Sequence, residues 1–311
     1  MDFILLIAGL IGLWLGTELT IGGALAIARR HQLSEFFVGL VILSIGSDLP
    51  EIAIAIDAGL KGLMGTDASG VVVGSSIGSV VAQIGFVLGL GGLISYLSLP
   101  RRFVLRHGAV LLVSTALLFL VAFDGTVTRI EGLTLIAFYF MYVIVLANRD
   151  SAHEEHPDAI AHGGARSWVL LVVGLVTVVL GSEITVDSVV SIAKTFNISE
   201  ALISVLIIGL GTSLPELSIS ISAILKKKTQ MSVGNIIGSN ILDTLLPIGL
   251  AAVISTVTLE RQIVFFDIPY IFILTTAVLA LFLRKDGVRR PQGALILSIY
   301  AIYVIVNLAQ F

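Results

Sequence analysis

Gly-Thr-Ser-Leu-Pro-Glu, at residues 211–216, interrupts an otherwise apolar stretch with two hydroxyls, a proline and a carboxylate. Such groups are costly to expose to lipid, so we expect them to face a protected site that water or ions can reach. A related segment, Gly-Ser-Asp-Leu-Pro-Glu, stands at residues 46–51. The rest of the sequence is organised around these two copies.

The composition is that of an integral membrane protein. Of the 311 residues, 57% are hydrophobic and 13% are charged, whereas a soluble domain carries about 25% charged residues. The absence of cysteine excludes disulfides, thiolate metal sites and cysteine nucleophiles. The first apolar run follows Asp2 and precedes Arg29 and Arg30. This pattern predicts an uncleaved membrane span rather than a signal peptide.

Apolar stretches of about 20 residues predict an all-α transmembrane fold with ten helices. They lie near residues 3–28, 36–59, 71–98, 107–123, 130–147, 167–193, 202–224, 232–257, 263–283 and 291–309. We expect residues 1–148 and 167–311 to form two halves of one transport unit, joined by a cytoplasmic linker at 149–166. The linker contains histidines and acids, but no spacing fixes a ligand geometry, so we interpret it as a solvated segment.

Positive charge predicts the orientation in the membrane. With ten spans, 14 of the 18 Lys and Arg residues fall in the loops of one side. The positive-inside rule makes that side cytoplasmic and places both termini outside.

An internal repeat relates the two halves. A shift of 165 residues superimposes residues 46–51 on 211–216, and a shift of 160 then superimposes residues 77–79 on 237–239. Each half has five spans, an odd number, so the second half enters the membrane from the opposite side. This predicts two inverted-topology five-helix repeats, with a binding site at their interface near the middle of the membrane.

The chemistry predicted for this site is oxygen coordination of a cation. Pro50 and Pro215 lack an N–H, so the carbonyls of Gly46 and Gly211 lose their helical partners. Oxygen ligands with no cysteine or nearby histidine favour Ca²⁺, Na⁺ or Mg²⁺ over Zn²⁺ or Cu. The candidate ligands are the acids Asp48, Glu51, Glu216 and Asp243, the side chains of Ser47, Ser79, Gln83, Thr212, Ser213 and Ser239, and the backbone carbonyls of Ser44, Gly46, Gly209, Gly211 and Thr212.

A family resemblance makes this prediction specific. Residues 211–216, followed by Gly-Ser-Asn-Ile-Leu-Asp at 238–243, resemble the second alpha-repeat of the sodium/calcium exchangers of the calcium/cation antiporter superfamily. Residues 46–51 and 78–83 resemble the first alpha-repeat. The likeness covers the ten-span plan and is to the prokaryotic exchangers, which lack the cytoplasmic regulatory domain of animal members.

The resemblance implies a two-state antiporter. Glu51 and Glu216 would bind Ca²⁺ at the centre, assisted by hydroxyls and carbonyls around Ser47 and Thr212. Sodium ions would occupy flanking positions that reuse the two glutamates and involve Ser79, Ser213, Ser239 and their neighbours. The first and sixth spans would move as gates, with glycines of the first span offering a smooth surface for sliding.

Two positions depart from the family pattern. Asp48 stands where these exchangers usually have serine, and Gln83 where the first repeat usually has asparagine. The site therefore holds up to four acids, and at least one should be protonated when no cation is bound. This leaves open an H⁺/Ca²⁺ or K⁺-assisted antiporter that uses the same machinery.

Other interpretations also stay open. The hydroxyls could pack helices, Asp48, Asp243 and Gln83 could form hydrogen bonds without touching an ion, and Glu18 and Glu183 could line an access path or bond across a helix interface. An intramembrane hydrolase and a passive channel rank below the antiporter. We expect no enzyme activity, no cofactor and no nucleic-acid partner. We expect a monomer in a prokaryotic inner membrane, with the bilayer and small cations as its partners.

Overall fold

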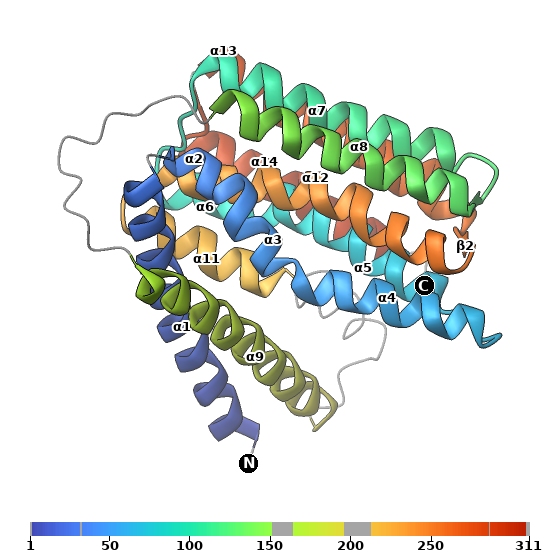
Figure 1. Cartoon of the computed structure of the whole chain (residues 1–311), viewed down its shortest axis with the longest axis horizontal. Coiled ribbons are helices and arrows are strands. Elements are labelled where there is room, and N and C mark those ends of the chain that lie inside the picture. Colours follow the sequence, from blue (N-terminus) through green and yellow to red (C-terminus); the bar gives the residue numbers. More distant parts are fainter. Residues whose placement is uncertain (1, 32, 151–163, 196–212, 286, 309–311) are drawn as a thin grey trace.

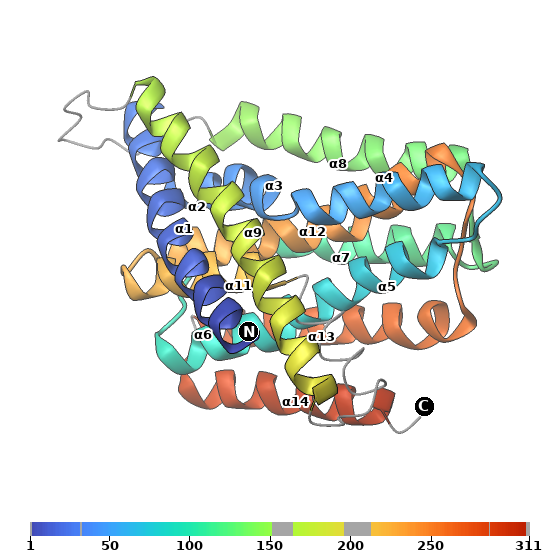
Figure 2. The ribbon, with the colours of Figure 1, turned by 90° about the horizontal axis from the view of Figure 1, so that it is seen from below.

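Two long oblique helices crossing one end of a helical bundle define the architecture (Figures 1 and 2). The structure is a computed structural model. It describes residues 2–31, 33–150, 164–195, 213–285 and 287–308. The crossing helices are the first and sixth predicted spans, and the remaining spans form the bundle.

The first half of the chain supplies five spans in the predicted order. The first span is α1 (Asp2–His31). The second consists of α2 (Glu35–Phe37), η1 (Val38–Leu43), α3 (Ser44–Ser47) and α4 (Leu49–Leu63), and the third of α5 (Ser69–Ala82), η2 (Gln83–Val87) and α6 (Leu88–Ile94). The fourth and fifth spans are α7 (Arg101–Val121) and α8 (Arg129–Asp150). Helix α7 begins six residues before the predicted start of the fourth span. Its first turns carry arginines, whose long side chains can reach polar surroundings from a helix end.

The second half follows the same plan. It contains α9 (Ala165–Thr195), α11 (Leu214–Leu225), α12 (Thr229–Ile254), η3 (Ile263–Asp267) with α13 (Ile268–Lys285), and α14 (Arg290–Leu308). Seven described helices are long and apolar enough to cross a membrane, and the bent segment 35–63 makes an eighth. Helices α11 and α14 lie at the seventh and tenth predicted spans.

The two halves repeat their helix–helix contacts. A Cβ placed on Gly293 would lie 2.7 Å from the carbonyl oxygen of Gly89, and one on Gly132 would lie 2.7 Å from that of Gly249. Gly89 and Gly249 are 160 residues apart, and Gly132 and Gly293 are 161 apart. The pairs α6·α14 and α12·α8 are therefore equivalent interfaces in which paired glycines bring two backbones together.

The loop pairings repeat as well. Strand β1 (Thr126–Val127) pairs antiparallel with β2 (Val257–Thr258), and Val127 lies opposite Val257. A single bridge joins Leu97 to Val288. These two residues are the counterparts of Val257 and Val127 at shifts of 160 and 161, so the bridge is the second copy of the short ribbon.

Helices α1 and α9 run antiparallel and lie side by side, inclined to the bundle in both views (Figures 1 and 2). A Cβ on Gly16 would lie 2.7 Å from the backbone nitrogen of Val178, and one on Gly181 would lie 2.8 Å from that of Leu13. A shift of 165 converts the first contact into the second. The pseudo-two-fold axis thus relates the two sides of this crossing. Gly22 is the exception among the glycines of the first span, with open space around it.

Helix α12 is the central element. Its residues from Met231 to Ala252 are buried with few exceptions, and both apolar and polar side chains lie inside. A helix that is apolar on all sides belongs in the interior of a helical protein. This position carries Asp243 into the centre of the bundle.

Candidate functional site

The second span breaks in the middle, at Asp48. The axes of the segments 35–47 and 49–63 differ by 43°, and the break separates α3 from α4 in Figure 1. Asp48 has φ −86° and ψ 9°, and its counterpart Ser213, before α11, has φ −88° and ψ 5°. Pro50 and Pro215 stand in the first turn of the following helix in each copy. The proline-containing motif therefore gives both repeats the same local backbone.

Four acids are buried around these breaks. Asp48, Glu216 and Asp243 have no exposed surface, and Glu51 is 1% exposed. Six of their carboxyl oxygens find no hydrogen-bond partner among the described residues: Oδ2 of Asp48, both oxygens of Glu51, both of Glu216 and Oδ1 of Asp243. A buried polar atom without a partner is costly, and a buried charge more so. These oxygens are the strongest indication of a ligand in the molecule.

No basic side chain in the described ranges forms an ion pair with any of the four acids. The ion pairs of the described residues join Lys61 to Asp57, Lys226 to Glu18 and Lys228 to Glu35, all outside the cluster. Asp48 lies within electrostatic range of the other three carboxyl groups. It approaches Glu216, but not in the geometry of a hydrogen bond. A cation or a proton is what can relieve this repulsion.

The acids surround the break without forming a ready-made cage. Among the described residues, no three acid or histidine side chains are close enough to hold one metal ion in common. Hydroxyls and backbone oxygens would therefore have to complete any coordination shell. Ca²⁺ takes 6–8 oxygen ligands in flexible geometry, which suits a mixed set of this kind.

Hydroxyl and amide groups join the two repeats at the cluster. The Oγ atoms of Ser79 and Ser213 are 3.0 Å apart, which links α5 to the start of α11. Gln83 Nε2 donates to Asp243 Oδ2 at 3.0 Å. Gln83 and Asp243 are equivalent positions of the two repeats, so this bond crosses the pseudo-two-fold axis. The predicted residues therefore meet at the repeat interface.

Some of the other predicted ligands are also described by the structure, and some lie outside the described residues. Ser47 Oγ lies 3.4 Å from Asp48 Oδ1, and Ser239 Oγ is buried with no partner. The Ser44 carbonyl already accepts bonds from the Asp48 N–H and the Ser47 hydroxyl. Three predicted ligands lie outside the described residues: Gly209, Gly211 and Thr212.

One buried residue of the cluster escaped the sequence analysis. Asn240 is fully buried on α12, and its Nδ2 donates to Gln83 Oε1 at 3.0 Å. A signal was available in the sequence, because Asn240 lies three residues before Asp243 and so shares its helix face. The equivalent residue of the first repeat is Val80.

Glu18 and Glu183 occupy different surroundings. Glu18 Oε2 lies 2.7 Å from Lys226 Nζ, so it bonds across the interface between α1 and α11. Glu18 also lines a cavity of about 440 Å³ between these helices, together with Trp14 and Leu217. Glu183 is exposed. The interfacial interpretation of Glu18 is confirmed, and its position on a cavity wall keeps the access-path interpretation open.

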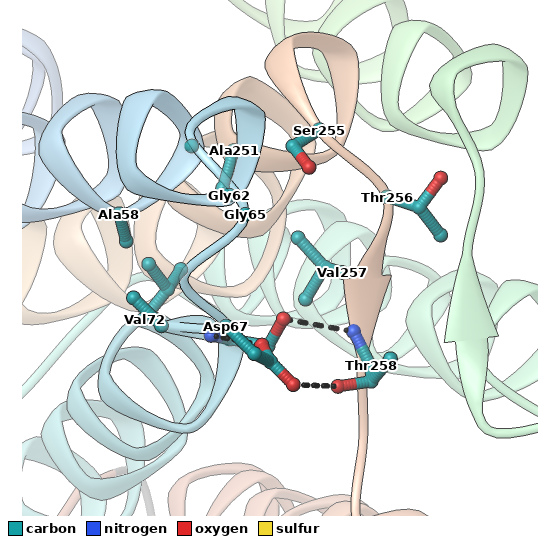
Figure 3. Close-up of a pocket in the computed structure, with 13 residues that line it drawn as sticks. Ala58, Gly62, Gly65, Asp67, Val72, Ala251, Ser255, Thr256, Val257 and Thr258 are labelled. Atoms are coloured by element: carbon teal, nitrogen blue, oxygen red, sulfur yellow. Dashed lines mark hydrogen bonds between the residues drawn. The ribbon is translucent and has the colours of Figure 1, made fainter.

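A second polar cavity lies at the far end of α4 (Figure 3). It has a volume of about 230 Å³ and is lined by residues of α4, α5, α12 and β2. Asp67 Oδ1 accepts from the Ser69 N–H at 2.9 Å, and Asp67 Oδ2 accepts from the Thr258 hydroxyl at 3.3 Å. The Ser69 backbone N–H holds the pKa of Asp67 below its ordinary value. None of the predicted site residues lines this cavity.

Inverted repeats with two helix breaks and a buried, uncompensated acid cluster at their interface define a transmembrane cation transporter. The sequence model of the sodium/calcium exchanger protein family matches residues 1–148 and 166–309. The chain therefore belongs to the sodium/calcium exchanger family, whose function is the antiport of Na⁺ and Ca²⁺.

Relatives and solved structures agree with this family. An uncharacterised membrane protein, MJ0091 of Methanocaldococcus jannaschii, is 31% identical over 95% of this chain and 94% of its own. The sodium/calcium exchanger MaX1 of Methanosarcina acetivorans is 25% identical over 98% of both chains. A structure of the sodium-calcium exchanger NCX_Mj, soaked with Na⁺ and Sr²⁺, matches with a TM-score of 0.84 at 29% identity, over 98% of this chain and 97% of that one.

Proposed function

We propose that Asp48, Glu51, Glu216 and Asp243 form the site at which this exchanger binds Ca²⁺ and Na⁺ in turn. The observation that carries the proposal is the set of six buried carboxyl oxygens for which the described part of the chain offers no hydrogen-bond partner. With no Lys or Arg paired to these acids in the described part of the chain, a bound cation supplies the missing charge.

The ligands divide by position. Glu51 and Glu216 follow the two breaks and bind Ca²⁺ centrally, with the Ser47 and Thr212 hydroxyls beside them. Backbone carbonyls complete the shell, and the candidates are Ser44, Gly46, Gly209, Gly211 and Thr212. Sodium ions occupy flanking positions near Ser79, Ser213 and Ser239.

Exchange of the two ions follows because Na⁺ and Ca²⁺ share ligands. Because both ions need the same two glutamates, binding of Na⁺ weakens binding of Ca²⁺ and the reverse. Helices α1 and α9 pack against each other through glycines and lie against the bundle beside the breaks, where a Cβ on Gly46 would touch the Leu175 side chain. We assign this pair as the moving gate and the bundle as the static part.

The orientation of the transporter in the membrane follows from the distribution of its Lys and Arg residues. The loops rich in Lys and Arg face the cytoplasm, and both termini lie outside. Residues 1–148 and 167–311 act as one transport unit, in a monomer, with 149–166 as the cytoplasmic linker. We place the protein in the inner membrane of a prokaryotic cell, with Ca²⁺ and Na⁺ as substrates and no resident cofactor.

The test is uptake of radiolabelled Ca²⁺ into proteoliposomes loaded with Na⁺, compared with vesicles loaded with K⁺ or given only a pH gradient. We expect uptake to require internal Na⁺. Glu51→Gln and Glu216→Gln should each lower it by about 100-fold or more, because losing even an outer partner of a metal ligand costs 10–100-fold. The matched control is Glu260→Gln, an exposed acid outside the cluster.

The alternative outcomes are distinct. Uptake driven by the pH gradient alone would replace Na⁺ with H⁺ as the driving ion, with Asp48 as the first residue to examine. Normal uptake in either glutamine variant would remove that glutamate from the site. No Ca²⁺ flux under any gradient, from folded protein, would contradict Ca²⁺ as the substrate.

A further inference from the structure

The side-chain amide of Asn240 has a fixed orientation. Its Nδ2 lies 2.6 Å from the backbone carbonyl oxygen of Ile236 and 3.0 Å from Gln83 Oε1. A backbone carbonyl can only accept a hydrogen bond. The Ile236 carbonyl therefore fixes which end of the Asn240 amide is the nitrogen, and that nitrogen must meet an acceptor on Gln83.

The orientation of the Gln83 amide follows from that of Asn240. With Oε1 accepting from Asn240, Nε2 faces the cluster and donates to Ser79 Oγ and Asp243 Oδ2, both at 3.0 Å. A primary amide has two N–H donors, so both are used. Gln83 then has no oxygen to offer a cation beside Asp243.

We propose that Asn240 is a positioning residue that holds the Gln83 amide with its N–H groups, rather than its oxygen, toward Asp243. The inference rests on the proposed cation site. The N–H groups carry partial positive charge, and one of them occupies Oδ2 of Asp243. Among the described residues Oδ1 has no partner, so it is the oxygen of Asp243 left free for a cation. The Gln83 amide nitrogen thereby takes the place that a further cation would occupy beside Asp243 Oδ2.

Only the second repeat has an amide side chain at this position. The position equivalent to Asn240 in the first repeat is Val80, which has no polar group. Val80 is fully buried, like Asn240. Valine at position 240 would therefore reproduce a residue that the other half of the protein already packs in the equivalent place. This makes Asn240→Val the natural variant for a test.

The experiment measures the Na⁺ concentration that half-saturates Ca²⁺ exchange in proteoliposomes of the full chain. In Asn240→Val, Gln83 Oε1 loses its donor and gains by turning toward a cation, since an unpaired buried oxygen is costly. We expect the half-saturating Na⁺ concentration to fall by about tenfold, the size of one hydrogen bond to a charged group. The maximal rate should change less. In a Gln83→Leu background, the same substitution should cause no further shift.

The matched control is Asn235→Val. Asn235 is another buried amide of α12, but it donates to Ser220 and not to Gln83. A shift of the same size in Asn235→Val, or in Asn240→Val made in the Gln83→Leu background, would overturn the proposal. So would an unchanged Na⁺ dependence in folded Asn240→Val.

Two further measurements keep the outcome decisive. If Asn240→Val does not fold, Asn240→Leu keeps the approximate size and removes the donor without adding a charge, so it should produce the same shift. If the wild type shows no Na⁺-dependent Ca²⁺ uptake, the proposed function fails by itself. Thermal unfolding of wild type, Asn240→Val, Gln83→Leu and the double variant then decides the positioning role. Shifts in midpoint that simply add would refute it.

Discussion

The two repeats share a backbone and differ in chemistry. Asp48 and Ser213 have nearly the same φ and ψ and stand at the same break, yet one is an acid and the other a hydroxyl. Gln83 and Asp243 reverse the pattern, with the acid in the second repeat. Each repeat contributes two acids to the cluster: Glu51 and Glu216 occupy equivalent positions, whereas Asp48 and Asp243 do not. The backbone is therefore the symmetric part of the molecule, and the side chains at the breaks are the unequal part.

Among the variants that test this comparison, the largest effect is expected in the symmetric part, at the crossing of α1 and α9. Gly16→Ala and Gly181→Ala would each place a methyl group against the backbone of the partner helix. Overpacking of this kind costs 1–3 kcal/mol, so we expect transport to fall by about tenfold or more in each variant. Because the two contacts are equivalent, the two losses should be similar. Na⁺-dependent Ca²⁺ uptake measures both.

The control for this prediction is on the same helix. Gly22 has open space around it, so Gly22→Ala should leave uptake unchanged. A large loss in only one of Gly16→Ala and Gly181→Ala would show that the crossing is not used symmetrically during transport.

An intermediate effect is expected where the repeats differ. Asp48→Ser gives the first repeat the hydroxyl that the second has at Ser213. Removing one of four clustered acids should change the preference for Ca²⁺ over Na⁺ by about tenfold, within the range for groups near a metal. It should also reduce inhibition by protons, because one proton-accepting group is lost. Competition uptake at several pH values measures both, with the exposed Asp57→Ser as control. Unchanged selectivity and pH profile would remove Asp48 from the cation site.

The smallest effect is expected at the helix ends that follow the breaks. Helix α4 is followed by Gly65 with φ +86°, and α11 by Lys227 with φ +62°. Gly65→Ala should destabilise the fold by about 1–2 kcal/mol, the cost of a side chain in the left-handed region. Lys227→Gly should change stability less, since relief of strain is offset by a more flexible unfolded chain. Thermal unfolding in detergent compares them, and a larger change at Lys227 would contradict this explanation.

Local sequence signals were sufficient for the helix order and the breaks. Apolar length predicts spans, and the two proline motifs predict the interruptions at Asp48 and Ser213, because proline acts on its own helix. The burial of Asp48, Glu51, Glu216 and Asp243 also follows, since acids inside apolar spans must face the interior. The assignment of these residues as ligands stays a prediction.

Relations between distant residues were not accessible in the same way. The pairing of Glu18 with Lys226 joins residues 208 positions apart, and no local pattern encodes it. The role of Asn240 depends on the direction of three successive hydrogen bonds, which becomes apparent only when Gln83 is placed beside it. The glycines of the first span were expected to face a partner as a group, but only the packing distinguishes Gly16 from Gly22.

The lengths of α1 and α9 can be compared with the thickness of a lipid bilayer. The two helices contain 30 and 31 residues, which corresponds to about 45 Å at 1.5 Å per residue. The hydrocarbon core of a bilayer is about 30 Å thick. Helices longer than the hydrocarbon core either tilt or extend into the headgroup region, so a thicker or thinner bilayer changes the arrangement at which the energy of the pair is lowest. With this pair as the proposed gate, we expect acyl-chain length to change the transport rate without any molecule occupying the ion site.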